Sequence, residues 1–476
     1  MLAQGAASDT ALVLPDGTQI KYGALRESVD RALRMLEFLP KRSLIAIGAE
    51  ASVDFVVLYL AILESQHVAL LLPPRFTASQ IAGIANAFEP ELFALSSASS
   101  AVVSDYRNIS AFGPFAILKG PFADKKSLHP DLSTVLLTSG STGKPQGVRL
   151  SSANILANAE SICEGLRIDS ADRAINSLPL HYCYGLSVLN SHLFAGASVV
   201  ITGDSPTQPD FWRTFCERDA TSFAGVPLVY DAAWRMFSRS WPGRLKTLTQ
   251  SGGRLHDEVA RRYVELADRH DGRFIAMYGQ TEATARISCV DIVERPDRIG
   301  SVGKAIPGGS VTVGPALDGI RGGEVIYRGP NVMMGYASSR TDLEKGDELG
   351  GVLQTGDLGV IEDGFLYLTG RLKRISKIHG RRICLDEVQA ALAIVGDVAV
   401  SGTDNEIFVF HVAPYGSRLA KSIDAICAAF NISRSDIRTS MIDSLPVTAS
   451  GKIDYGTLRD RASILHIDRS RARLDD

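Results

Sequence analysis

The hydrophobic positions of the first half of the chain alternate between two periods. Runs of consecutive apolar residues, typical of buried strands, are separated by segments whose apolar residues recur every three or four positions, as on one face of a helix. Residues 9–22 carry two short apolar runs around the turn Pro15-Asp16-Gly17, which predicts a β-hairpin. Helices are predicted at 22–38, 52–64 and 152–166, and buried strands at 43–47, 68–72, 134–137, 197–202, 222–224 and 274–277. Strands that alternate with helices predict an α/β fold with mixed, largely parallel sheets.

The pattern changes after about residue 300. Glycines become frequent in 303–370, and short alternating segments at 324–327 and 365–369 predict a β-rich subdomain. A basic stretch, strand-like segments and short helices at 385–394 and 422–430 follow. We therefore predict a large N-terminal domain of several subdomains, residues 1–370, and a small α+β C-terminal domain, residues 371–476, on a hinge.

Composition narrows the class of protein. The 476 residues suggest about three structural units at roughly 150 residues each. Apolar residues make up 45% and charged residues 22%, which excludes a disordered chain. The 50 basic and 53 acidic residues give a net charge of −3. The chain therefore lacks the excess of positive charge that a dedicated nucleic-acid-binding protein uses to attract its ligand.

The cysteines and the apolar runs bear on the cellular compartment in which the protein is expected. The six cysteines form no C-x-x-C pair, which excludes a metal cage or a disulfide framework and fits reduced thiols in the cytosol. The first residues do not resemble a signal peptide, and the longest apolar run, 55–63, is too short to span a bilayer. We expect a cytoplasmic protein with no membrane span and leave its oligomeric state open.

The most informative stretch is LTSGSTGKPQGV at residues 137–148, directly after a predicted strand. Glycines let backbone N–H groups approach an anion closely, hydroxyl groups donate further hydrogen bonds, and Lys144 adds charge. The stretch therefore predicts a phosphate-binding loop, with an ordinary surface loop as the alternative. It is not a P-loop of the G-x-x-x-x-G-K-[ST] type, because Pro145 follows the lysine where a hydroxyl residue would be needed for magnesium.

This stretch resembles the signature of the adenylate-forming superfamily, [YL]-T-S-G-[ST]-T-G-x-P-K-G-V, with Gln146 in place of the usual lysine. The superfamily contains acyl-CoA synthetases, luciferase-type enzymes and nonribosomal adenylation domains. Five more segments are similar to its motifs in the same order: YGQTEA at 278–283, GEVIYRGPNVMMGY at 323–336, TGD at 355–357, GRLK at 370–373 and PVTASGKID at 446–454. The similarity covers roughly residues 10–460, and the chain is identified as a member of the superfamily.

The resemblance implies ATP-dependent activation of a small carboxylic acid to an acyl-adenylate, with release of pyrophosphate, and acyl transfer to a thiol. A carboxylate is a poor acyl donor because its oxygen leaves poorly, and adenylation converts that oxygen into a phosphate ester. Positioning and charge neutralisation supply most of the catalysis in such transfers. The expected enzyme is an AMP-forming acid–thiol ligase that uses ATP and Mg²⁺, with CoA as co-substrate.

The resemblance also implies roles for single residues. Thr281 would contact the α-phosphate, Glu282 would hold Mg²⁺, and Lys452 would bridge the carboxylate and the α-phosphate as charge moves. Asp357 would accept hydrogen bonds from the ribose, assisted by Arg371. Taken alone, each of these residues fits an ordinary turn or surface position. The other implied ATP-binding residues are Thr138, Ser139, Gly140, Ser141, Thr142, Gly143, Lys144, Gly252, Gly253, Tyr278, Gly279 and Gln280.

The GRLK segment resembles the hinge about which the family rotates its small domain after adenylation, with Lys373 as the pivot. The loop at Gly380 would then enter the site, and Arg381 and Arg382 would lie near the thiol acceptor. Residues 371–382 hold six basic side chains, which could meet the phosphates of CoA or an acidic carrier protein. The alternative is a solvated basic strand pair.

Residues 178–187 resemble the family's motif P-[LM]-[FY]-H-x-x-G-[LM], but His181 precedes the usual position of the histidine and Tyr182 occupies it. Either ring could gate a carboxylate pocket whose walls would include Val226 and Gln250. No acidic residue lies in this stretch to pair with an ammonium group, so an organic or fatty acid is favoured over an α-amino acid. No G-x-D-S-L carrier site is fused, so the acceptor would be free CoA or a separate acyl carrier protein.

Three alternatives stay open at this point. The enzyme could activate an amino acid or load a carrier protein without CoA activity. It could oxidise an adenylate, as luciferases do. It could also be a nucleotide-binding scaffold without catalysis, for which Gln146 is the main hint and against which Glu282, Asp357, Arg371 and Lys452 count.

Overall fold

The computed structural model describes residues 2–74, 76–96, 105–121, 127–139, 145–379, 381–392, 395–403, 406–414, 416–447 and 453–472. The chain divides into two compact units. The first contains Met1–Ser310 and Arg328–Leu353, and the second contains Val311–Tyr327 and Gln354–Asp476. The predicted boundary at residue 370 falls inside the second unit, near the end of one of its strands (Phe365–Arg371), and stays a prediction of where the chain rotates.

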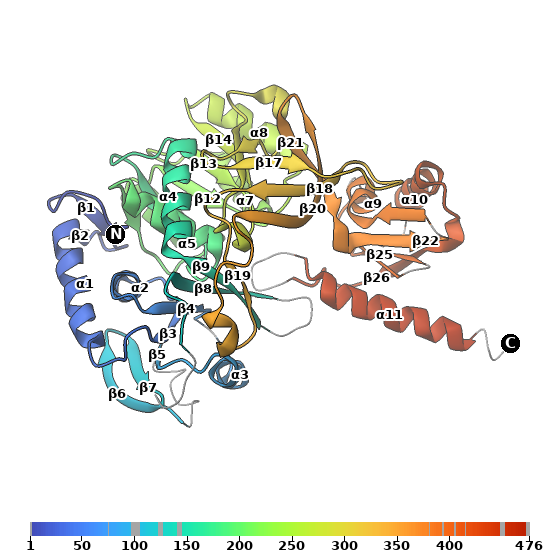
Figure 1. Cartoon of the computed structure of the whole chain (residues 1–476). Helices are drawn as coiled ribbons and strands as arrows, with labels where there is room; N and C mark the ends of the chain where they lie inside the picture. Colours follow the sequence, from blue (N-terminus) through green and yellow to red (C-terminus); the bar gives the residue numbers. More distant parts are fainter. Residues whose placement is uncertain are drawn as a thin grey trace. The chain divides into compact units, whose positions relative to one another are not determined.

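The first unit contains a nine-stranded sheet in the order β16-β15-β14-β13-β12-β10-β11-β1-β2. Figure 1 labels β1, β2, β12, β13 and β14 of this sheet. Its central strands, from β14 to β1, are parallel, and antiparallel strands close both ends. The strands are β1 (Thr10–Val13), β2 (Gln19–Lys21), β10 (Arg173–Ile175), β11 (Ser198–Val200), β12 (Ser222–Gly225), β13 (Thr247–Gln250), β14 (Arg273–Tyr278), β15 (Ser288–Asp291) and β16 (Lys304–Ala305).

An eight-stranded sheet in the order β19-β9-β8-β4-β3-β5-β7-β6 forms the other half of this unit. Strands β8, β4, β3 and β5 are parallel, and the outer pairs are antiparallel. The strands are β3 (Leu44–Gly48), β4 (Val68–Leu72), β5 (Leu92–Ser96), β6 (Arg107–Phe112), β7 (Phe115–Lys119), β8 (Leu132–Ser139), β9 (Pro145–Ser151) and β19 (Gly335–Ala337).

One hydrophobic core joins the two sheets of the first unit. It combines side chains from strands of both sheets with the apolar faces of α1, α2, α4 and α5. The sequence sets several helix starts, since Ser52 caps α2, and Ser151 and Asn154 form a capping box on α4. The helices are α1 (Tyr22–Leu36), α2 (Val53–Glu64), α3 (Ala78–Phe88), α4 (Ser152–Leu166), α5 (Cys183–Phe194), α6 (Pro209–Glu217), α7 (Pro227–Phe237) and α8 (Asp257–Asp268), with the 3₁₀ turns η2 (Thr281–Ala283), η3 (Pro296–Arg298) and η4 (Arg340–Glu344).

Within its described residues, the second unit contains three small sheets. Their strand orders are β17-β18-β20-β21, β22-β23 and β24-β25-β26. The strands are β17 (Ser310–Val313), β18 (Gly323–Arg328), β20 (Val352–Glu362), β21 (Phe365–Arg371), β22 (Ile375–Ile378), β23 (Arg381–Cys384), β24 (Val398–Gly402), β25 (Ile407–His411) and β26 (Ile437–Met441).

Alternation along β24 and β25 gives the last sheet two apolar faces. Val400 and Val409 pack with α9 (Leu385–Leu392) and α10 (Ser417–Phe430), whereas Phe408 and Phe410 on the other face pack with α11 (Tyr455–Ala472). The described residues of the unit also include the 3₁₀ turns η5 (Leu372–Arg374) and η7 (Arg434–Asp436).

The observed fold is the predicted α/β architecture with mixed sheets, a β-rich part after residue 300 and a small α+β part at the C-terminal end. The hairpin at 9–22 and the helices predicted at 22–38, 52–64 and 152–166 are confirmed as β1–β2, α1, α2 and α4. The predicted elements do not include α3, α5, α6, α7, α8 and α11. Within the described residues, no helix is long and apolar enough to cross a membrane. None of the six cysteines, all of which are described, forms a disulfide.

Candidate active site

The glycine-rich stretch joins two central strands of the eight-stranded sheet. β8 and β9 pair antiparallel, with Thr138 opposite Gln146 and Ser139 opposite Pro145. The hydroxyl of Thr138 donates to the carbonyl oxygen of Gln146 at 3.3 Å, so Gln146 contributes its backbone to the stem of this hairpin. The predicted phosphate-binding residues Gly140, Ser141, Thr142, Gly143 and Lys144, and the side chain of Ser139, lie outside the described residues.

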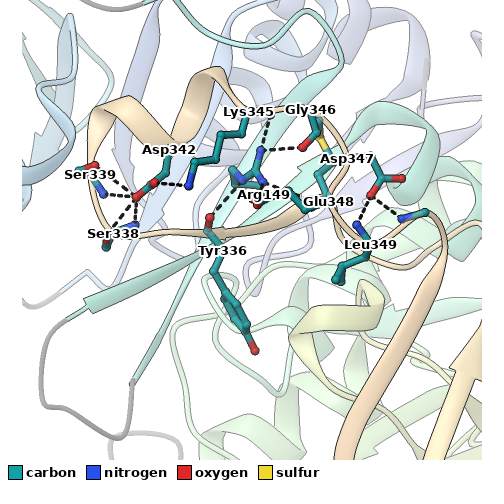
Figure 2. Close-up of polar contacts among 12 residues, drawn as sticks. Arg149, Tyr336, Ser338, Ser339, Asp342, Lys345, Gly346, Asp347, Glu348 and Leu349 are labelled. Atoms are coloured by element: carbon teal, nitrogen blue, oxygen red, sulfur yellow. Dashed lines mark hydrogen bonds and ion pairs between the residues drawn. The ribbon is translucent and has the colours of Figure 1, made fainter.

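The other edge of β9 pairs with β19, which places Tyr336 opposite Val148. Arg149, on β9, is fully buried, and its guanidinium donates to backbone carbonyl oxygens of the segment around β19 and η4, and to the carboxylate of Glu348 (Figure 2). The accepting carbonyls belong to Met334, Tyr336, Lys345 and Gly346. Arg149 therefore fixes residues 334–348 against the hairpin that precedes the phosphate-binding stretch.

Tyr336 reaches from β19 to the predicted magnesium ligand. Its hydroxyl donates to Oε1 of Glu282 at 2.7 Å, and the backbone N–H of Met333 donates to the carbonyl of Glu282 at 2.9 Å. Burial and the neighbouring carboxylate raise the pKa of Tyr336 well above its usual value of 10, so the phenol stays protonated and acts as a donor. The structure thus joins Glu282 to the strand beside the β8–β9 hairpin.

The conformation of the turn that carries Thr281 and Glu282 depends on Gly279 and on the side chain of Asn331. A Cβ at Gly279 would overlap the carbonyl oxygen of Ala285, so glycine is required there. Thr284 and Ala285 have φ values of 52° and 104°, which returns the chain to β15. The side-chain amide of Asn331 holds this conformation by donating to the carbonyls of Ala283 and Arg286 at 2.7 and 2.8 Å.

Glu282 has the chemistry expected of a magnesium ligand. Its side chain is partly exposed, and Tyr336 occupies one of its oxygens. Magnesium usually keeps several waters and takes one or two carboxylates together with substrate phosphates, so a single glutamate is sufficient. Among the described residues no group of three His, Cys, Asp or Glu side chains could form a closed metal cage. The residues present fit a magnesium ion that arrives with a nucleotide.

Three parallel strands end at the same edge of the nine-stranded sheet, and predicted site residues follow each of them. Val226 follows β12, Gln250 ends β13, and Tyr278 ends β14. The amide of Gln250 donates to the carbonyl of Gly253 at 2.8 Å, and Gly252 adopts a φ of 84° in this turn. Ligands of open α/β sheets bind at the carboxyl ends of the strands, so this edge is a suitable binding surface. Gly253 packs against Pro227 at the start of α7.

His181 and Tyr182 lie at the start of α5, where Tyr182 is the N-cap residue. Nδ1 of His181 is buried and has no hydrogen-bond partner among the described residues. Burial lowers the pKa of His181 to about 4, so its ring is neutral at pH 7. The imidazole is therefore not a positive charge for a carboxylate.

In the second unit, Asp357 and Arg371 face each other across β20 and β21. Nε of Arg371 donates to Oδ1 of Asp357 at 3.1 Å, and the Asp357 side chain is only 15% exposed. The structure therefore brings together the two residues predicted to bind the ribose. Lys373 is exposed in η5, two residues further on.

The basic stretch forms the antiparallel pair β22–β23. Arg381 and Arg382 begin β23 and are exposed, and Arg381 donates to the carbonyl of Asn431 at 2.7 Å. Gly380, between these strands, lies outside the described residues, as does Lys452. The residues on either side of the latter loop, Val447 and Ile453, form an antiparallel bridge.

Sequence reasoning gave no role to Tyr336, Arg149 or Arg286. Tyr336 was visible as the last residue of the GEVIYRGPNVMMGY segment, but its partner lies 54 residues away. Arg149 follows the signature directly and carries no motif of its own. Arg286 is buried in the first unit, and a single arginine after the YGQTEA segment gave no signal of burial.

A sequence model of the family described as "AMP-binding enzyme" matches residues 2–337, more than half of the chain. The chain is 26% identical over 489 residues to the oxalate–CoA ligase of Arabidopsis thaliana, covering 93% of both chains. It is 27% identical over 355 residues to the 2-succinylbenzoate–CoA ligase of Bacillus licheniformis, covering 70% of this chain and 71% of that protein.

Solved structures show the same fold. The o-succinylbenzoate CoA synthetase of Bacillus subtilis, in complex with its acyl-adenylate intermediate, superposes with a TM-score of 0.77 at 21% identity, covering 96% of both chains. A structure of that enzyme with ATP and a magnesium ion gives a TM-score of 0.76 at 21% identity, covering 96% of this chain and 98% of that one.

Proposed function

The chain belongs to the family of AMP-binding enzymes, as its motifs predict, and from this premise we propose a reaction in two steps. The enzyme activates a carboxylic acid with ATP to an acyl-adenylate, and it then transfers the acyl group to a thiol. It is an AMP-forming acid–thiol ligase with the fold of an acyl-CoA synthetase. ATP, Mg²⁺ and CoA are its small-molecule requirements.

The observation that carries this function is the hydrogen bond between Tyr336 and Glu282 beside the β8–β9 hairpin. The hairpin leads into the glycine- and hydroxyl-rich stretch that predicts phosphate binding, and Glu282 is the carboxylate that would hold magnesium. A phosphate-binding loop next to one partly exposed carboxylate is suited to a nucleotide triphosphate and its metal ion.

In the first step, a carboxylate oxygen of the acid bonds to the α-phosphorus, and the bond from that phosphorus to the bridging oxygen of pyrophosphate breaks. Residues 138–144 would bind the leaving phosphates, and Glu282 would hold Mg²⁺, whose charge offsets that of the triphosphate. Thr281 would orient the α-phosphate, and Asp357 with Arg371 would fix the ribose. Lys452 would accompany the charge as it moves from the carboxylate to pyrophosphate.

In the second step, the sulfur of a thiolate bonds to the acyl carbon and AMP leaves with the oxygen that joined them. The thiol proton passes to solvent. We propose free CoA as the acceptor, supported by the exposed arginines Arg381 and Arg382 on β23, which can meet its phosphates. The two CoA ligases to which the chain is similar support the same acceptor. A separate acyl carrier protein is the competing acceptor.

We also propose a cytoplasmic location, because none of the six cysteines is disulfide-bonded.

The experiment is ATP-dependent pyrophosphate release, with hydroxylamine as a trap, across aliphatic, aromatic, dicarboxylic and amino acids, each with and without CoA. Acid-dependent release that forms a hydroxamate establishes adenylation, and CoA-dependent AMP release establishes the acceptor. Glu282→Gln should abolish release while the thermal unfolding midpoint changes little. Release with amino acids alone, or AMP release only with a carrier protein, would select an alternative enzyme. Binding of ATP without release for any acid would support the inactive scaffold.

A further inference from the structure

Arg286 is a buried cation that has no counter-charge in the part of the chain that the structure describes. The residue is 2% exposed, and Nε and Nη1 have no hydrogen-bond partner among the described residues. Its guanidinium carbon lies 4.9 Å from the centre of the Tyr184 ring. An arginine out of water normally forms several charge-assisted hydrogen bonds, as Arg149 does in this chain, because leaving the charge unpaired is costly.

The ionisable groups around Arg286 do not supply the missing negative charge. The groups that interact electrostatically with Arg286 are the phenols and thiols of Tyr184, Cys289, Cys183 and Tyr182, and none of them is a carboxylate. Burial raises the pKa of Tyr184 to about 12 and also raises that of the Cys289 thiol, so both groups are neutral at pH 7. Tyr184 in addition donates its hydroxyl hydrogen to the carbonyl of Thr249 at 2.9 Å.

Arg286 lines a small cavity of about 30 Å³. One carboxylate, Asp172, also lines it but has other partners. It accepts hydrogen bonds from the hydroxyl of Thr221 and the backbone N–H of Asp169, both at 3.1 Å, and it lies 3.8 Å from Nζ of Lys246. The unsatisfied charge in this cavity is therefore positive, and the cavity is built to receive an anion.

The cavity adjoins the predicted acid pocket. Ala224 and Thr249 line it; Ala224 lies two residues before Val226, and Thr249 directly precedes Gln250. Arg286 itself follows Glu282 by four residues, and its backbone is fixed because the amide of Asn331 donates to its carbonyl. The rest of the wall is mainly aliphatic, with serine hydroxyls and the neutral ring of His192. Such a wall suits a short hydrocarbon body.

We propose that this cavity receives the far end of the acid, and that Arg286 forms a bidentate ion pair with a second carboxylate there. The substrate class is then the dicarboxylic acids, which rests on the proposed function because the first carboxylate is the one adenylated. Arginine is suited to this role because its planar fork matches both oxygens of a carboxylate. The substrate would supply the counter-charge that the folded chain lacks.

The test compares diacids with monoacids of equal carbon number: succinate with butyrate, glutarate with valerate, and adipate with hexanoate. For the pair with the best diacid, wild-type kcat/KM for pyrophosphate release should favour the diacid by roughly a hundredfold or more, because a monoacid leaves Arg286 unpaired. Arg286→Met should lose most of this preference by slowing the diacid, whereas Arg286→Lys should keep part of it. Arg262→Met, on the exposed surface of α8, is the matched control and should keep the full preference.

A binding measurement separates this inference from the proposed function. The best diacid should raise the thermal unfolding midpoint of wild type but not that of Arg286→Met, whether or not pyrophosphate is released. Stabilisation without release for any acid would support the cavity assignment and contradict the proposed function. Equal turnover of monoacids and diacids, or a preference unchanged in Arg286→Met, would overturn the inference and leave the ligase intact. If the methionine variant does not fold, the wild-type preference and Arg286→Lys decide.

Discussion

Tyr336 offers Glu282 one hydrogen bond, and that bond leaves the rest of the carboxylate available. The phenol is 39% exposed, so it orients the carboxylate without burying it. A carboxylate that is oriented in advance loses less conformational freedom when it binds a cation. Burying the carboxylate fully would instead cost it the free energy of its hydration. This single contact therefore explains how a glutamate in a turn can act as a positioned ligand.

Tyr336→Phe should weaken adenylation by about 10- to 100-fold, because a hydrogen bond to a charged group contributes roughly 1.5–3 kcal/mol. The loss should appear as a higher magnesium requirement in pyrophosphate release, since the ring remains and only the donor to Glu282 is removed. Titration of activity with Mg²⁺ measures it. An unchanged magnesium dependence would mean that Tyr336 does not position Glu282.

His181 should make stability depend on pH. Burial lowers its pKa to about 4, below its usual 6.5, so the unfolded chain binds the proton more readily. The contribution is complete above pH 6.5 and is lost as the pH falls from 6.5 to 4, with a total on the order of 3 kcal/mol. His181→Gln should reduce the difference in unfolding free energy between pH 7 and pH 4.5, measured with urea. Parallel pH profiles for both proteins would contradict this.

At the scale of elements, Arg149 links β9 to the segment that carries β19 and η4 (Figure 2). The Arg149 side chain is fully buried, and most of its hydrogen bonds go to backbone carbonyl oxygens. Its carboxylate partner, Glu348, is partly exposed to solvent. The strand that presents Tyr336 has only three residues, so pairing with β9 alone is a weak support. The arginine makes this short strand part of the sheet.

Arg149→Met should reduce the free energy of unfolding by about 3–5 kcal/mol, because it leaves buried carbonyls without donors. Glu348→Gln is the control and should cost under about 1 kcal/mol, since Glu348 is 47% exposed. Urea unfolding measures both changes. Equal losses in the two variants would mean that the ion pair, rather than the carbonyl contacts, holds the segment.

The predictability of elements from the sequence depended on how many of their faces are buried. α1 buries one stripe, at Tyr22, Leu25, Val29 and Ala32, and its helical period is visible in the sequence. α5 buries all but two of its residues, so it shows no polar face and no helical period. Its start also coincides with the HYCYG segment, whose residues suggested a pocket and not a helix.

At the scale of the whole molecule, the order of the motifs predicted the family. The alternating pattern also predicted largely parallel sheets, and in the structure Val226, Gln250 and Tyr278 lie at one sheet edge because parallel strands align their carboxyl ends. The contacts of Arg149 and the isolation of Arg286 could not be predicted. They depend on partners that lie close in space but far along the chain, and a single sequence contains no signal for them.

The two units also allow a test of the predicted pivot. Lys373→Pro should spare acid-dependent pyrophosphate release and block thioester formation, because proline fixes the φ angle that rotation would change. Lys373 is the second residue of η5, where a backbone N–H is not needed for the first turn, so the variant should fold. Lys373→Ala, which keeps φ free, is the control. Thioester formation by the proline variant would exclude this residue as the pivot.

The route of the chain between the two units limits how the protein can be divided. The segment 311–327 belongs to the second unit, although the first unit resumes after it at Arg328. It supplies most of β17 and β18, which complete one sheet with β20 and β21. A fragment that begins at Gln354 would therefore leave β20 with an open edge that invites association with other chains. An exchange of the second unit between relatives would therefore have to transfer residues 311–327 together with residues 354–476.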